Sequence, residues 1–221
     1  MFRRSESSPA IDPPAPRFSR GLSITGFAVL LLIGLLAVVF AQSRSTAGGD
    51  SAEQALNEGR YDEVAELTAG LAPTDPTGVV LRARADIARG RYQEAEQALR
   101  PIAQQDPEGD AALELGLLLH YLRREEARPI LDDVASGISS ARDAADLVRA
   151  GRALQALNLP RDADSAFREA AAASPGNPEV ETAWGNLFLE RHNNADAVKS
   201  FQAALESTKW APALLGMARA L

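Results

Sequence analysis

The hydrophobic and polar residues of this chain change in pattern twice. Residues 1–21 combine Ser, Arg and four prolines without periodic apolar positions, which predicts a short disordered tail. Residues 22–41 contain no charged residue. From residue 51 to residue 221, apolar residues recur at helical spacing, as at Leu147, Leu154 and Leu157. The pattern therefore predicts a tail, an apolar segment, a linker at residues 42–50 and an all-α domain.

The uncharged run at residues 22–41 predicts a transmembrane helix. Its 20 residues, 13 of which are Leu, Ile, Val or Phe, would span about 30 Å, the thickness of a hydrocarbon core. Four Arg precede the run and Arg44 alone follows closely, so the positive-inside rule places the tail in the cytoplasm. We expect a single-pass protein of the bacterial inner membrane with extracytoplasmic, periplasmic repeats. The alternative is cleavage of a signal peptide near Ala41, followed by secretion.

Residues 51–221 contain a repeated pattern of two helices joined by a turn. The residue that opens each second helix recurs at spacings of 31, 32, 36 and 34: Val64, Ala95, Ala127, Ala163 and Ala197. Each first helix has a small residue where a neighbour must approach closely: Ala52, Ala83, Gly116, Gly151 and Gly185. One helix pair cannot bury its apolar face alone, so stacked pairs should share a continuous core.

The third unit departs most from this pattern. It lacks the closing Pro that follows Asp or Ser in three other units, and Pro129 lies inside its predicted second helix. Because Pro cannot continue a regular helix, we expect a kink or an early turn at this point. A longer link through Ser136–Ser140 should follow.

The units resemble the tetratricopeptide repeat (TPR) family, whose period is about 34 residues. The fourth unit carries the family's spacing at the following positions: Gly151, Ala163, Phe167, Ala170 and Pro175. The resemblance implies an α-solenoid of about five TPR-like repeats, with a truncated last repeat. Residues 211–221 look like the first helix of a sixth unit with uncovered leucines, which predicts an N-terminal fragment of a longer protein. A ragged end or dimerisation through this helix would also explain them.

Composition and motifs exclude several kinds of chemistry. The chain has no Cys, which removes disulfides and thiolate metal sites, and no H-E-x-x-H, phosphate-loop or hydrolase motif is present. We therefore expect no enzyme activity, no metal and no cofactor from these residues. Residues 45–221 carry 18 basic and 28 acidic side chains, and this acidic balance argues against a nucleic-acid partner.

The resemblance implies a concave groove lined by the first helices. Its inward polar positions would be Arg84, His120, Tyr121, Arg152, Gln155, Asn186 and Glu190. Arg84 and Arg152 occupy equivalent places and would suit a carboxylate or an acidic peptide. The alternative is that each Arg is a surface residue in an exposed ion pair, which contributes under about 1 kcal/mol.

We therefore expect a membrane-anchored scaffold that binds a protein or peptide partner in its groove on the extracytoplasmic side. Two alternatives remain open. The chain is the repeat region of a larger exported enzyme, for example a peptidase, whose catalytic domain lies beyond Leu221. Otherwise it is a structural component of an envelope assembly that mainly oligomerises. The sequence indicates neither the partner's identity nor the oligomeric state.

Overall fold

The computed structural model of this chain describes residues 49–206 and 208–221. All regular structure in that part is helical and begins with residues 49–57. The later elements are α2 (Tyr61–Leu67), α3 (Pro76–Ala88), α4 (Tyr92–Gln105), α5 (Asp110–Tyr121), α6 (Ala127–Ser136), the 3-10 helix η1 (Gly137–Ser140), α7 (Ala144–Ala156), α8 (Pro160–Ala173), α9 (Pro178–Glu190), α10 (Asn194–Leu205) and α11 (Ala211–Ala220).

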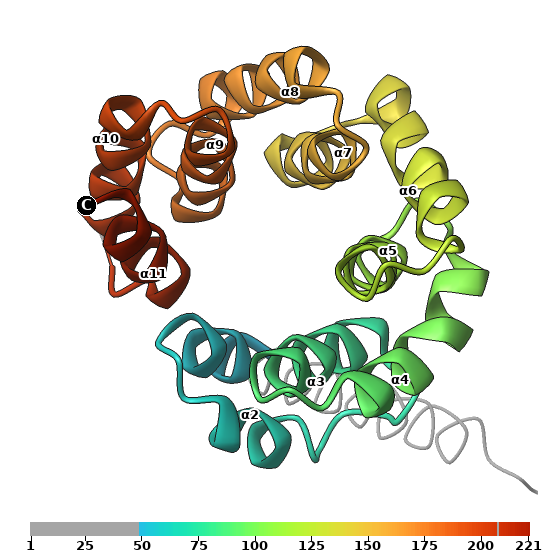
Figure 1. Cartoon of the computed structure of the whole chain (residues 1–221). Helices are drawn as coiled ribbons and strands as arrows, with labels where there is room; N and C mark the ends of the chain where they lie inside the picture. Colours follow the sequence, from blue (N-terminus) through green and yellow to red (C-terminus); the bar gives the residue numbers. More distant parts are fainter. Residues whose placement is uncertain (1–48, 207) are drawn as a thin grey trace, which may run out of the picture. The chain divides into compact units, whose positions relative to one another are not determined.

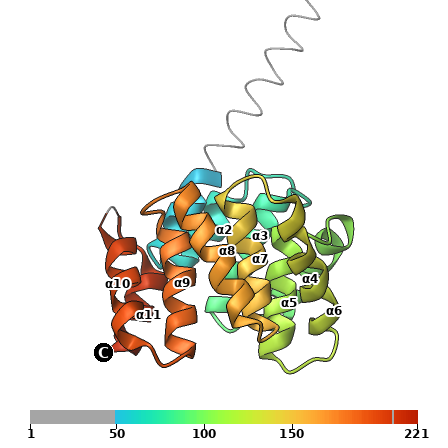
Figure 2. The same cartoon turned by 90° about the horizontal axis from the view of Figure 1, so that it is seen from above.

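Consecutive helices form pairs that stack into a solenoid. In each pair the first helix lies on the inside and the second on the outside, as α7 and α8 or α9 and α10 show in Figure 1. The first helices also contact one another in the order α3, α5, α7, α9 and α11. Figure 2 shows the helix axes side by side along the array. The predicted arrangement of stacked helix pairs is confirmed.

The curvature of the solenoid brings its two described ends together. In Figure 1, α11 lies beside the helical residues that precede α2. A Cβ atom added to Gly59 would lie 3.5 Å from Cβ of Ala211. Cavities at this point are lined jointly by residues 50–61 and residues 208–212. Residues 49–206 and 208–221 therefore form a nearly closed ring with an interior surface.

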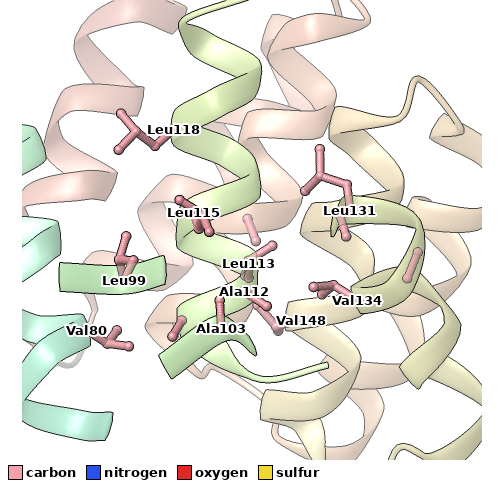
Figure 3. Packing of buried hydrophobic residues seen from close by; sticks show 14 of the residues in the cluster. Val80, Leu99, Ala103, Ala112, Leu113, Leu115, Leu118, Leu131, Val134 and Val148 are labelled. Atoms are coloured by element: carbon pink, nitrogen blue, oxygen red, sulfur yellow. The ribbon is translucent and has the colours of Figure 1, made fainter. Parts of the chain in front are cut away.

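One large cluster of buried apolar residues runs from α3 to α9, and two smaller clusters lie toward the described ends of the array. At its centre, α5 is packed between α3 and α4 on one side and α6 and α7 on the other (Figure 3). Leu113, Leu115 and Leu119 of α5 are each at most 3% exposed. Burial of one such side chain stabilises the fold by about 1.5–3 kcal/mol, so α5 anchors the middle of the array.

Side-chain caps determine where three of the inner helices begin. Asp75, Asp143 and Asn177 accept hydrogen bonds from backbone N–H groups at N···O distances of 2.7, 3.0 and 2.9 Å. Each cap satisfies a backbone donor that has no partner inside the helix, and contributes about 1 kcal/mol. The starts of α3, α7 and α9 are thereby fixed, and with them the residues that these helices present to the interior.

The predicted small residues lie where the helices of a pair cross. A Cβ atom added to Gly151 would be 2.6 Å from Cε1 of Phe167, and one added to Gly185 would be 2.6 Å from Cε1 of Phe201. At Gly116 the nearest atom is Cδ2 of Leu131, at 2.8 Å. These distances are shorter than van der Waals contact, so the prediction of close approach is confirmed.

Substitution of Gly151 by Leu is therefore expected to lower the free energy of unfolding by about 1–3 kcal/mol or more, because Phe167 is fully buried and cannot move aside. Urea unfolding followed by circular dichroism would measure the change. Gly70→Leu is the matched control, since no atom lies within 4 Å of a Cβ at that position. Equal stability of the two variants would contradict the packing role of Gly151.

Pro129 does not kink the second helix of the third unit. Helix α6 begins at Ala127, so Pro129 is its third residue, where a backbone N–H would have no partner within the helix. The turn at Arg123–Glu126 is the one that joins α5 to α6, and the expected longer link after α6 contains η1. Neither the kink nor the early turn expected at Pro129 is observed, because α6 continues without a break from Ala127 to Ser136.

The turn inside each helix pair contains one residue in the left-handed backbone region. The five residues, with φ between 55° and 78°, are Gly59, Gly90, Arg123, Asn158 and His192. Glycine adopts this conformation without steric cost, whereas Arg and His are strained in it. The same turn geometry is therefore kept in all five units although the residue type changes.

The membrane part of the predicted fold is wrong. Among residues 49–206 and 208–221, no helix is long and apolar enough to span a membrane. The longest of these, α4 and α8, have 14 residues and extend about 21 Å, against about 30 Å of hydrocarbon. The fold class is corrected to an all-α solenoid, and the predicted inner-membrane or secreted location is withdrawn. The predicted tail at residues 1–21 and the predicted span at residues 22–41 lie outside the described residues.

Candidate functional site

Three charged side chains meet at the centre of the inner surface. Oε1 of Glu114 on α5 accepts hydrogen bonds from Nε of Arg84 on α3 at 2.9 Å and from Nη1 of Arg152 on α7 at 3.0 Å. The Glu114 side chain is 7% exposed, and each of the two Arg side chains is 27% exposed. One carboxylate therefore links three consecutive first helices.

The electrostatics of this triad keep its members charged. Burial alone would raise the pKa of Glu114, but the positive charges of Arg152 and Arg84 outweigh burial and lower it to about 2. The negative charge of Glu114 in turn raises the pKa of Arg84. Arg84 and Arg152, which were expected to bind a partner's carboxylate, thus already bind the carboxylate of Glu114. Their role in binding a partner stays a prediction.

Two cavities of the ring interior adjoin the triad: Arg84 and Arg152 line both of them, and Glu114 lines the second. The first cavity has a volume of about 420 Å³, and the second has a volume of about 250 Å³. Both are lined by the same four charged side chains: Glu53, Arg84, Arg152 and Glu179. In the first cavity, Arg149 is paired with Asp110 and Asp146 at 2.7 and 2.8 Å. Charged side chains from several elements therefore line both cavities.

Two residues that line the second cavity each have a buried polar atom without a partner. It is bounded by residues from both described ends of the chain, with Tyr61 on one side and Trp210 on the other. Within the described residues, two buried side-chain polar atoms lack a hydrogen bond, namely Oγ1 of Thr182 and Nε1 of Trp210. Both residues line this cavity. Because buried polar groups nearly always have partners, two such atoms at one cavity indicate an incomplete site.

Three of the residues expected in the groove line the second cavity: Arg84, Arg152 and Asn186. The other four expected residues, His120, Tyr121, Gln155 and Glu190, line neither of the two cavities. Tyr121 is 66% exposed, and its ring centroid lies 5.6 Å from that of Tyr92. The structure thus gathers only part of the predicted set.

Several residues of the site do not appear in the sequence-based prediction. Glu53 and Glu179 carry its remaining negative charge, and Glu114 holds its arginines. The sequence pattern could have indicated Glu53, because it directly follows the small residue Ala52, just as Arg84 directly follows Ala83. Thr182 and Trp210 gave no comparable signal, because neither occupies that repeated position.

The arrangement offers charge and hydrogen bonds for binding. In the part of the chain that the structure describes, no group of three or more His, Asp or Glu side chains is placed to hold a metal ion. The cavity instead combines carboxylates, guanidinium groups, an indole N–H and a hydroxyl. These groups suit the recognition of a polar, extended ligand.

No protein-family model and no curated protein matches the sequence. Solved structures match its fold. The TPR protein TTC0263 of Thermus thermophilus is 22% identical, with 81% of this chain and 98% of that chain covered and a TM-score of 0.57. A TPR protein from Parabacteroides merdae is 15% identical, with 89% of this chain and 78% of that chain covered and a TM-score of 0.53.

This chain has the tetratricopeptide-repeat fold. The family resemblance is therefore confirmed at the level of fold, which is what identities this low can show. In the TPR description, α3, α5, α7 and α9 are the first helices of repeats two to five. Both cavities lie on the side that these first helices line.

Proposed function

We propose that this TPR domain is a protein-interaction scaffold that holds a peptide segment of its partner in the second cavity. The observation that carries the proposal is the pair of buried polar atoms without partners, Thr182 Oγ1 and Trp210 Nε1, at one cavity of the inner surface. Leaving such a group unsatisfied costs about 1–3 kcal/mol, and a bound ligand that supplies partners removes this cost.

A peptide backbone has the groups that this cavity lacks. A peptide carbonyl accepts a hydrogen bond from the indole N–H of Trp210, which is a donor only. The hydroxyl of Thr182 both donates and accepts, so it suits either a peptide N–H or a carbonyl. The amides of Asn57 and Asn186, which line the same cavity, offer further hydrogen bonds to an extended segment.

The test is a selection of random heptapeptides against the full-length chain, followed by affinity measurements on the peptides obtained. Thr182→Val keeps the side-chain volume and removes only the hydroxyl, and Trp210→Phe removes the N–H. Each substitution is expected to weaken peptide binding by about two- to tenfold, which corresponds to the free energy of one hydrogen bond. Thr182→Val is expected to raise the free energy of unfolding of the ligand-free protein by about 1–3 kcal/mol, since it removes a buried hydroxyl that has no partner there.

Trp184→Phe is the matched control. Nε1 of Trp184 donates to Oδ1 of Asp164 at 3.0 Å, and Trp184 lines neither cavity. Its substitution should therefore leave peptide affinity unchanged. Peptides that bind Thr182→Val and Trp210→Phe as well as the wild type, or a selection that yields no binder, would refute the proposal.

A further inference from the structure

The second cavity has more negative than positive charge. Three carboxylates line it, those of Glu53, Glu114 and Glu179, against the two guanidinium groups of Arg84 and Arg152. Both arginines are bound to Glu114. Within the described residues, Glu53 and Glu179 form no ion pair within 4.0 Å. The charge that remains for a ligand is therefore negative.

The two unpaired carboxylates disfavour each other. Glu53 belongs to helical residues 49–57 and Glu179 to the first turn of α9, so two separate elements place them at one cavity. Loss of hydration raises the pKa of Glu53, and the negative charge of Glu179 raises it further. A positive charge between them would remove this repulsion.

The rest of the lining suits a long cationic side chain. Tyr61 and Trp210 provide aromatic surfaces, which attract a nearby ammonium or guanidinium group. Leu56 and Ala183 provide apolar surface for an aliphatic stem. Acidic, aromatic and apolar groups are thus combined in a cavity of about 250 Å³.

We infer that the second cavity binds the side chain of a Lys or Arg residue within the partner's peptide. The cation lies between Glu53 and Glu179, and the backbone carbonyl of the same peptide accepts the hydrogen bond of Trp210 Nε1. This inference rests on the proposed function and specifies its ligand. An acidic peptide fits less well, because it would have to displace the buried Glu114 from two arginines and would add negative charge beside Glu179.

The two tryptophans of the chain allow a direct test in one spectrum. Full-length protein labelled with 15N is titrated with three blocked tripeptides, N-acetyl-Ala-X-Ala-amide, in which X is Lys, norleucine or Glu. Norleucine has the stem of Lys without the ammonium group. We expect the Lys peptide to shift the indole signal of Trp210 and to leave that of Trp184 in place, because Trp184 is already bonded to Asp164. The norleucine peptide should bind about tenfold more weakly, as expected for loss of one charge-assisted hydrogen bond.

Charge-neutral variants locate the cation. Glu53→Gln and Glu179→Gln are each expected to weaken binding of the Lys peptide about tenfold and to leave binding of the norleucine peptide unchanged. Glu169→Gln is the matched control, because Glu169 is exposed on α8 and lines neither cavity. It makes the same change in net charge.

The outcomes separate this inference from the proposed function. Equal affinity for the Lys and norleucine peptides, or tighter binding of the Glu peptide, overturns the inference. So does a heptapeptide selection whose binders occupy the second cavity but contain no basic residue, and in that case the proposed function stands. A selection without any binder overturns both.

Discussion

Phe201→Ala is expected to lower the free energy of unfolding by about 3–5 kcal/mol, as for other fully buried aromatic side chains. Phe201 on α10 is 0% exposed. Its ring lies between two glycines of neighbouring helices, since a Cβ atom at Gly185 or Gly216 would come within 2.6 Å of it. The ring therefore joins α9, α10 and α11, and its removal leaves a cavity that rigid helices cannot close.

Urea unfolding of the full-length chain measures this effect. Leu214→Ala is the control, because Leu214 on α11 is 54% exposed and its loss should change stability by less than about 0.5 kcal/mol. We also expect Phe201→Ala to weaken peptide binding, since α11 follows directly after Trp210 of the second cavity. If the free energy of unfolding of Phe201→Ala lies within about 1 kcal/mol of the wild-type value, other contacts hold α11 in place.

Glu114→Gln is expected to lower the free energy of unfolding by about 3 kcal/mol, at the low end for a broken buried ion pair. The substitution keeps the shape of the side chain but removes the one carboxylate that is paired with both Arg84 and Arg152. Partial exposure of both arginines, 27% each, moderates the cost. Glu126→Gln, which breaks an exposed pair with Arg100 at 2.8 Å, should cost under about 1 kcal/mol.

The pH dependence of the free energy of unfolding tests whether ionised Glu114 is the source of this stabilisation. The pKa of Glu114 falls from 4.5 to about 2 on folding, so the triad's stabilisation is fully present above pH 4.5 and is lost as pH falls toward 2. Glu114→Gln has no such carboxyl and should lose less stability over that range. If the free energy of unfolding of the wild type and of Glu114→Gln falls equally steeply between pH 4.5 and about pH 2, Glu114 is not the group that titrates.

The repeat pattern predicted the helices better than it predicted the site. Small residues such as Gly151 and Gly185 mark where two helices cross, and that contact is local in the sequence, so the pattern contains it. The partners of Glu114 lie 30 and 38 residues away. Which inward residues reach one another across helices depends on how strongly the stack curves, and periodicity within a unit does not give this curvature.

The position of a residue within its unit explains which of the predicted groove residues line the second cavity. Arg84, Arg152 and Asn186 follow directly after the small residue of their helices, and all three line the second cavity. In the third unit the equivalent residue is the apolar Leu117, and the predicted polar residues of that helix, His120 and Tyr121, lie near the end of α5. The polar residue that α5 contributes to the second cavity is Glu114, which lies two residues before Gly116, between Leu113 and Leu115.

The meeting of α11 with residues 50–61 limits how this protein can change during evolution. In an open array each unit contacts only its neighbours, so a unit can be duplicated or lost while the others keep their surroundings. Here the second cavity takes Tyr61 from one end and Trp210 from the other. One added unit would make the ends collide, and one lost unit would leave a gap as wide as a helix pair between Tyr61 and Trp210. The number of repeats is therefore as much a determinant of the binding site as any side chain in it.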